Sequence, residues 1–207
     1  MIKEISRKMM SWDSPVFVSH WLTAISFCGA VLTQDGERFR QVHVTMGYTM
    51  LGVVAFRIIW GFIGSKYARF STMTSRFTKV REHIQMLFCD KNQAIRGLQA
   101  IGFSAAYLLI FFVLLVSITG YLTFNEIGPE IVSEIHEFVA NLLMGLVIIH
   151  VGAILLTALY QYLQKKSIDT EKKMAVLTNR VRPYRWLAVM LVSLVVYFWG
   201  VQFKILQ

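Results

Sequence analysis

The sequence predicts an all-α fold: a transmembrane helical bundle with a four-helix core and a fifth transmembrane helix. Of the 207 residues, 56% are apolar and only 16% are charged, which is too apolar a composition for an ordinary soluble domain. Five stretches approach the length of about 20 apolar residues that a helix needs to cross a bilayer. A helix also satisfies its own backbone polar groups in lipid. We therefore expect a multi-pass membrane protein.

The five predicted spans follow one another without an internal repeat or a linker domain. They cover Val16–Thr33, His43–Ile63, Ile101–Phe124, Ile135–Leu163 and Trp186–Phe203. The first span is short and the fourth is long, so tilt or protrusion from the bilayer is expected. We expect residues 1–165 to form the four-helix core, and residues 166–207 to add a basic connection and the fifth helix.

The basic residues predict the orientation of the chain. Seventeen of the 21 Lys and Arg lie in the N-terminal segment and in the connections after the second and fourth spans, whereas the opposite face has Arg38, Arg40 and Lys204. Because cytoplasmic loops are rich in Lys and Arg, we expect a cytoplasmic N-terminus and an external C-terminus. Membrane topology thus explains the net charge of +9, and nucleic-acid binding is not expected.

The connection after the second span has a helical pattern of its own. Apolar residues between Phe77 and Phe88 recur near helical spacing with charges between them. An interfacial amphipathic helix and an ordinary solvated helix both fit this pattern. His83 lies in this segment and is expected to be exposed to solvent. Cys28 and Cys89 are expected to be free thiols, and the absence of a Cys-x-x-Cys-His motif excludes covalent haem attachment.

Four of the five histidines, His20, His43, His136 and His150, fall in the predicted spans. A polar side chain is costly there, so each of them marks a candidate functional site. Because successive spans run in opposite directions, His20 and His150 are predicted near the cytoplasmic side, and His43 and His136 near the external side. Each level therefore holds two histidines from different helices.

The spacing on the fourth span favours two separate sites. His136 and His150 are fourteen residues apart, which is about 21 Å along a helix axis. The rotation between them is about 40° short of four full turns, so their side chains face the same side of the helix. They cannot share one metal ion, whose bonds to nitrogen are about 2 Å long. A histidine from each of two helices, on either side of a flat macrocycle, holds a six-coordinate haem in a bundle. We expect two such haems, one between His20 and His150 and one between His43 and His136.

Glycine and arginine on the same helices fit this arrangement. Gly47 is one turn after His43, where a missing side chain would admit a porphyrin edge, although close helix packing is also open. Packing is the preferred explanation for Gly29 and Gly52. Arg57 is fourteen residues after His43 and so shares its face at the cytoplasmic level. A haem propionate would suit its guanidinium, whereas reaching toward the cytoplasmic surface is the alternative.

Several segments resemble one family. The motif SWDSPVFVSHW (residues 11–21), the second-span motifs HVTMGY, FRIIWGFIG and YARF, and EIHEFVANLLMGLVIIH (residues 134–150) resemble bacterial cytochrome b-561 and nickel–iron hydrogenase cytochrome b proteins over about residues 11–165. The resemblance implies two non-covalent haems b with His20, His43, His136 and His150 as axial ligands. It also implies electron exchange with membrane quinone and with an external redox protein. TGYLTFNEIGP (residues 119–129) is similar to members thought to work with small c-type cytochromes.

One departure from the family pattern concerns the inner site. Members usually carry an arginine three residues before the first histidine, and here that position is Phe17. The inner propionates then have one partner fewer, which increases the expected role of Arg57 and puts a standard quinone pocket in doubt. A polar group of Trp12, Asp13 and Arg57 on the cytoplasmic side is a candidate for that pocket.

Three functions remain open from the sequence. The first is electron transfer across the bilayer between the quinone pool and an external partner such as a c-type cytochrome or hydrogenase. The second is a superoxide oxidase that passes electrons to quinone, with Arg38 and Arg40 attracting the anion. The third is a haem-free transporter or zinc protease, which is disfavoured because the sequence at His136 is HEFVAN, not His-Glu-x-x-His. Whether the chain is an enzyme in its own right is left open by these three.

Overall fold

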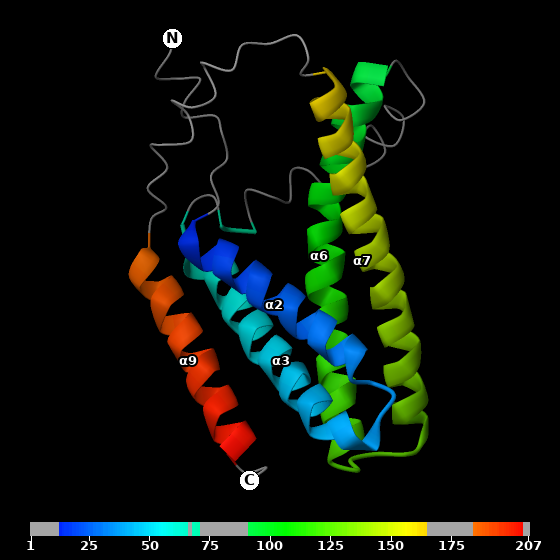
Figure 1. Cartoon of the computed structure of the whole chain (residues 1–207), viewed down its shortest axis with the longest axis vertical. Coiled ribbons are helices and arrows are strands. Elements are labelled where there is room, and N and C mark those ends of the chain that lie inside the picture. The colour runs from blue at the N-terminus through cyan, green and yellow to red at the C-terminus, as the bar shows by residue number, and fades with distance from the viewer. Residues whose placement is uncertain (1–12, 66–67, 71–90, 165–183, 205–207) are drawn as a thin grey trace. The chain divides into compact units, whose positions relative to one another are not determined.

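The computed structural model describes residues 13–65, 68–70, 91–164 and 184–204 (Figure 1). This part of the chain contains helices and turns and no strand, so the predicted all-α class is confirmed. Five helices are long and apolar enough to cross a membrane: α2 (Ser14–Leu32), α3 (Arg40–Ile63), α6 (Lys91–Phe124), α7 (Ile131–Gln164) and α9 (Arg185–Lys204), with a short η1 (Glu37–Phe39) before α3. They match the five predicted spans. His83, Cys89 and the predicted amphipathic segment lie outside the described residues, as does Trp12.

The third helix is longer than its apolar segment. α6 has 34 residues, about 51 Å, and begins ten residues before the predicted span Ile101–Phe124. The sequence before Ile101 is polar but contains good helix formers and no proline, so the backbone continues as helix beyond the apolar stretch. Apolarity therefore predicts the membrane-spanning part of α6 but not the start of the helix.

The chain divides into two compact units. One contains α2, α3 and α9, and the other contains α6 and α7. His20 and His43 belong to the first unit, and His136 and His150 belong to the second.

Asp13 ties the start of α2 to the end of α3. Its Oδ1 accepts the backbone N–H of Val16 at 3.0 Å and so caps the helix, and Pro15 suits the first turn. Its Oδ2 accepts the Trp60 indole N–H at 3.0 Å and the Ser65 hydroxyl at 2.6 Å. Asp13 is only 2% exposed, and a buried carboxylate is stable there because three donors replace its hydration.

The fifth helix packs along α2 and α3 (Figure 1). Its buried residues Ala188, Leu191 and Val195 recur at helical spacing. The Trp199 indole N–H donates to the Thr49 hydroxyl at 2.8 Å, and the side chains of Gln202 and Gln41 are 3.3 Å apart. Such polar contacts hold helices together in lipid, where the hydrophobic effect between helices is absent. The fifth helix is therefore part of the N-terminal unit.

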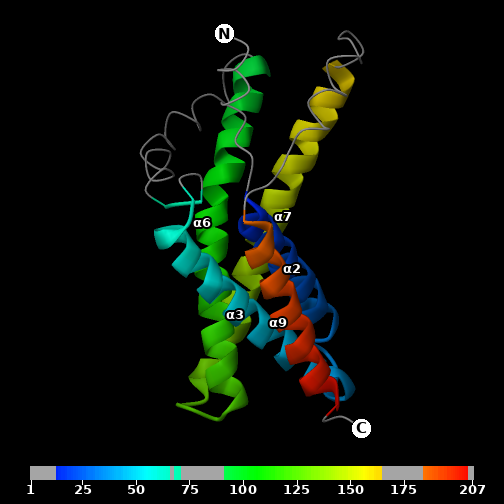
Figure 2. The same ribbon diagram turned by 90° about the vertical axis from the view of Figure 1, so that its left-hand side faces the viewer.

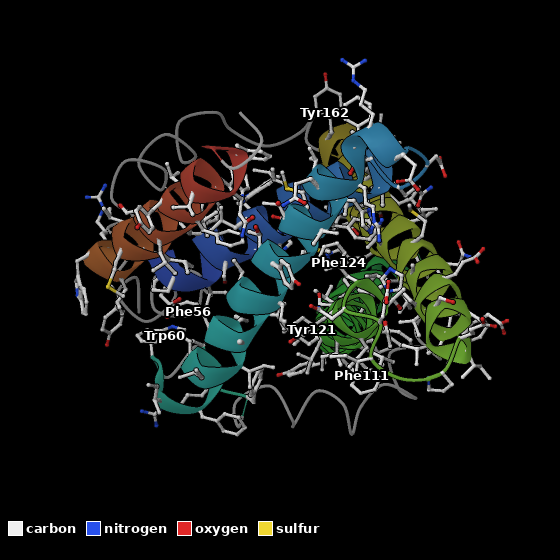
Figure 3. The ribbon with its side chains drawn as sticks, turned by 90° about the horizontal axis from the view of Figure 1, so that it is seen from below. Phe56, Trp60, Phe111, Tyr121, Phe124 and Tyr162 are labelled. Carbon is white, nitrogen blue, oxygen red and sulfur yellow. The ribbon has the colours of Figure 1, made fainter. Side chains whose placement is uncertain are left out.

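The aromatic side chains at the end of α3 continue this packing. Phe56 and Trp60 lie one turn apart on α3 with their rings stacked, 6.2 Å between centroids (Figure 3). The edge of Tyr184, just before α9, meets Trp60 at 5.3 Å. Trp60 thus contacts both the Asp13 carboxylate and Tyr184, the residue that precedes the fifth helix.

The second unit is a helical hairpin in which α6 and α7 run antiparallel and cross at an angle (Figure 2). Val113 and Val116 of α6 are buried with Val139 and Leu143 of α7. At the end of α6 the Ile127 N–H bonds to the Leu122 carbonyl and the Glu126 N–H to the Thr123 carbonyl, which is a Schellman motif. Glu126 occupies its left-handed position with φ 55°.

Candidate functional site

His43 lies in the first turn of α3 and reaches across to α2. Its Nδ1 is 2.8 Å from the carbonyl oxygen of Ala30. Ala30 belongs to the last turn of α2, where its carbonyl oxygen also accepts the N–H and the hydroxyl of the C-cap residue Thr33 at 3.3 Å, so His43 adds a donor from another helix. An Nδ1–H that donates to a carbonyl puts the lone pair on Nε2, and this is the tautomer in which an imidazole binds a metal through Nε2.

His136 has the corresponding arrangement in the hairpin. It lies near the start of α7, and its Nδ1 is 3.0 Å from the carbonyl oxygen of Val116 and 3.1 Å from the Thr119 hydroxyl, both on α6. Gly120 faces the ring: a Cβ there would lie 2.9 Å from Cε1 of His136. Two helices therefore position each of these two imidazoles, and both select the same tautomer.

The other two histidines lie deeper along their helices. His20 is on α2, is exposed within its unit, and meets Trp21 edge to face at 5.7 Å. His150 is half-buried on α7, about four turns after His136 and on the same face. Each unit thus carries two histidines on successive levels of its helices.

The fifth helix leaves the histidine face of α3 free. Thr49, the partner of Trp199, is rotated about 240° from His43 around the axis of α3. The buried Thr45 is rotated about 200° from His43 around the same axis. These positions are on the opposite side of the helix. α9 therefore packs on α2 and on this side of α3, and the side of α3 that carries His43 and Gly47 faces away from α9.

Arg57 points past the end of α3. Its Nη1 donates to the Ala68 carbonyl at 3.3 Å, and its guanidinium lies over the Phe70 ring, 5.4 Å from the centroid. These contacts fold the segment after α3 back against the helix. Asp13, a member of the suggested quinone group, has its two carboxylate oxygens bonded within the N-terminal unit. The structure therefore gives Asp13 a structural role.

The glycines have different surroundings. A Cβ at Gly29 would lie 3.1 Å from Met46, which confirms close packing of α2 on α3 at that point. At Gly52 the packing prediction is wrong for the described residues, because no atom of them lies within 4 Å of a Cβ there. Gly52 is exposed, on the opposite side of α3 from His43. Gly47 is half-buried, and it too has room for a Cβ among the described residues.

Three features of the site were not found from the sequence: the Ala30 carbonyl, Thr119 and Gly120. A carbonyl carries no sequence signal. Thr119 and Gly120 lie sixteen or more residues before His136, across the turn between the helices. Only the register of the hairpin brings them to the ring. The sequence signal that could have identified Gly120 is a glycine at nearly the same membrane depth as a histidine on the neighbouring antiparallel span.

The donor set fits haem better than a bare metal ion. The described residues hold no group of three or more His, Cys, Asp and Glu side chains able to bind one ion. Zinc sites take three or four protein ligands. A six-coordinate haem needs only two axial histidines, each oriented by a bond at its second ring nitrogen, and His43 and His136 have that bond.

The model of the family described as prokaryotic cytochrome b561 matches residues 11–166, which is most of the chain. The chain belongs to the prokaryotic cytochrome b561 family. The resemblance seen in the sequence is thereby confirmed. No curated protein and no solved structure matches the chain.

Membership of the cytochrome b561 family settles the broad function. The protein is a multi-pass membrane b-type cytochrome that binds haem b and takes part in electron transfer. The match covers α2, α3, α6 and α7 and ends before α9. The fifth helix is thus an addition to the family core in this chain.

Proposed function

We propose that this cytochrome binds two haems b, each between one histidine of the α2–α3 pair and one of the α6–α7 hairpin. His43 and His136 are the ligands of one haem, and His20 and His150 are the ligands of the other. The observation that carries this proposal is the bond from Nδ1 of His43 and of His136 to a carbonyl of the neighbouring helix. Both bonds leave Nε2 as the ligating nitrogen.

The two haems would carry single electrons between the membrane quinone pool and an external redox partner such as a c-type cytochrome or a hydrogenase. Bis-histidine coordination leaves no open position on iron, which favours electron transfer over chemistry at the metal. The match to a prokaryotic family supports a bacterial inner-membrane location, and the distribution of Lys and Arg supports a cytoplasmic N-terminus and an external C-terminus. The His43 and His136 haem is then the outer one.

The acidic end of the hairpin favours a basic partner. Four glutamates are exposed in and after the turn between α6 and α7: Glu126, Glu130, Glu134 and Glu137. Opposite charges accelerate encounter more than they raise affinity. Association with a basic c-type cytochrome should therefore slow markedly as salt is raised, and a rate independent of salt would contradict this part of the proposal.

Arg57 is proposed to pair with a propionate of the inner haem. Its guanidinium is charged and lies in a span, and it carries five N–H donors in a planar fork that suits a carboxylate. The contact with Phe70 orients its plane. Replacement by lysine would keep the charge but lose the bidentate geometry, so Arg57→Lys should alter the inner haem only.

The test is a pyridine haemochrome assay with haem counted per chain. Two haems b are expected in the wild type and one in each single variant His20→Ala, His43→Ala, His136→Ala and His150→Ala. His43→Ala and His136→Ala should remove the same spectral component, because they are assigned to one haem. His83→Ala is the control and should keep two. One haem in the wild type would show that one of the two histidine pairs is wrong.

Gly47 offers a second test that does not alter a ligand. No described atom is within 4 Å of a Cβ at Gly47 or at Gly52, so neither alanine clashes with the protein itself. Gly47 lies on the His43 face and Gly52 on the opposite one. Gly47→Ala should lower outer-haem content if a porphyrin edge fills the space, whereas Gly52→Ala should not. Equal haem content in both would contradict the role of Gly47.

The structure also bears on superoxide oxidation, the second candidate function. Arg38 and Arg40 are exposed, and Arg40 is three residues before His43 on α3. This closeness to an outer ligand could draw a small anion toward that haem. Asp35 and Glu37 are exposed in the same segment and oppose the attraction. Superoxide consumption by the purified protein, lost in Arg40→Gln, would favour this function over partner-linked transfer.

A further inference from the structure

Three residues of α6 meet the ring of His136, Val116 through its carbonyl and Thr119 and Gly120 beside it, and none of them is an axial ligand. We propose that Thr119 and Gly120 position His136 as a ligand of the outer haem and that the Thr119 hydroxyl lowers the reduction potential of that haem. This inference rests on the proposed function, because it requires His136 to bind iron.

The hydrogen-bond directions follow from the donors present. The Thr119 hydroxyl lies 3.0 Å from the Leu115 carbonyl and 3.1 Å from the Val116 carbonyl. A hydroxyl has one hydrogen, and it donates that hydrogen back along its own helix. Its lone pairs are then available to Nδ1–H of His136, 3.1 Å away. The His136 N–H is therefore shared between the Val116 carbonyl and the Thr119 oxygen.

This shared bond affects the iron through the imidazole. Acceptors at Nδ1–H increase the electron density of the ring and its basicity as a ligand. A more basic axial ligand stabilises the oxidised iron, which lowers the reduction potential. Thr119 is only 7% exposed, so water does not compete for the bond and the low local dielectric strengthens it.

Gly120 gives the ring its place against the α6 backbone. A Cβ at this position would lie 2.9 Å from Cε1, 3.3 Å from Nδ1 and 3.6 Å from Nε2 of His136. Real Cβ atoms essentially never approach a carbon to 2.9 Å, so an alanine would displace the ring. The ring cannot move without stretching its bonds to Val116 and Thr119. Gly120 therefore permits the ring orientation, and Thr119 fixes it.

The test compares Thr119→Val with Thr119→Ser and Thr123→Val in the purified holoprotein. Valine keeps the shape of threonine but removes the acceptor, and serine restores it. Thr123 is one turn further along α6 and bonds to the Thr119 carbonyl, so Thr123→Val is a matched control. Optical redox titration should show a higher potential for the outer haem in Thr119→Val, an unchanged inner haem, and wild-type values in Thr119→Ser and Thr123→Val.

The electron paramagnetic resonance spectrum gives an independent readout of ring orientation. Gly120→Ala should shift the outer-haem low-spin signal or abolish outer-haem binding. Gly145→Ala is its control, because no described atom lies within 4 Å of a Cβ there, and it should match the wild type.

Each negative result has a definite meaning. If Thr119→Val titrates like Thr123→Val, or if Thr119→Ser shifts as much as Thr119→Val, the hydroxyl has no such role. If the Gly120→Ala signal equals that of Gly145→Ala, the role of Gly120 is wrong. A wild-type protein with fewer than two haems would instead refute the proposed function, and the haem count shows this before any variant is compared.

Discussion

The N-terminal unit and the α6–α7 hairpin hold their helices together in different ways. In the N-terminal unit, Asp13, Thr49 and Gln41 make polar contacts between helices, and all three are residues without a proposed role in haem binding. In the hairpin, the bonds at His136 combine a structural contact with a proposed haem ligand. Both units have a polar contact between helices at a proposed ligand, His43 in one and His136 in the other. The comparison teaches that the N-terminal unit has further polar contacts between its helices that do not depend on the cofactor.

The largest expected effect comes from removal of haem. Ligand binding stabilises a fold by about 4 kcal/mol when the ligand exceeds its dissociation constant a thousandfold. We expect this loss to fall mainly on the hairpin, because the N-terminal unit keeps its contacts at Asp13, Thr49 and Gln41 when the cofactor is absent. Hydrogen exchange of holo and apo protein in nanodiscs should show faster exchange in α6 and α7 than in α2 and α3. Equal acceleration in both units would contradict the comparison.

Loss of Asp13 should be the largest effect of a single side chain on the N-terminal unit. Asp13→Ala removes a helix cap and leaves the indole of Trp60 and the hydroxyl of Ser65 without their acceptor. The cost is expected to be about 4 kcal/mol, since a cap contributes about 1 and each of the two bonds to a charged group about 1.5. Thermal unfolding in detergent measures it. Asp35→Ala, at an exposed carboxylate, is the control and should change little.

A substitution at Glu126 is expected to stabilise the turn of the hairpin. It occupies the left-handed region at φ 55°, which costs a residue with a side chain about 1 kcal/mol more than glycine. Glu126→Gly should therefore raise the stability of the hairpin by about that amount. Glu126→Ala removes the same carboxylate but keeps the strain, so it should not stabilise. Equal effects of the two variants would mean that charge, not backbone geometry, is responsible.

The smallest expected effect concerns the fifth helix. Trp199→Phe removes the bond to Thr49, and hydrogen bonds between membrane helices contribute about 0.6 kcal/mol. Reversible unfolding in mixed micelles should show a small destabilisation with two haems retained. Trp186→Phe, at a side chain 66% exposed on the same helix, is the control and should have no effect. A loss of haem in Trp199→Phe would indicate that the fifth helix acts on the haem site as well.

Much of the fold was predictable because the bilayer imposes it. The long apolar stretches predicted all five spans, and the spacing of fourteen residues predicted that His136 and His150 share a face. The beginning of α6 was missed because helix formation does not stop where the apolar residues do. The surroundings of Gly52 were predicted wrongly, because a glycine in a span is equally compatible with packing and with an open surface.

The sequence by itself determined the membrane class, the family and the four candidate ligands, since hydropathy, motif and helical spacing are local properties. Only the tertiary structure decided that Ala30, Val116 and Thr119 orient His43 and His136, that Gly120 makes room for the His136 ring, and that the fifth helix packs on α2 and α3. These contacts join residues on different helices. Their physical basis is the register in which neighbouring helices pack, which depends on the whole interface and not on any single segment.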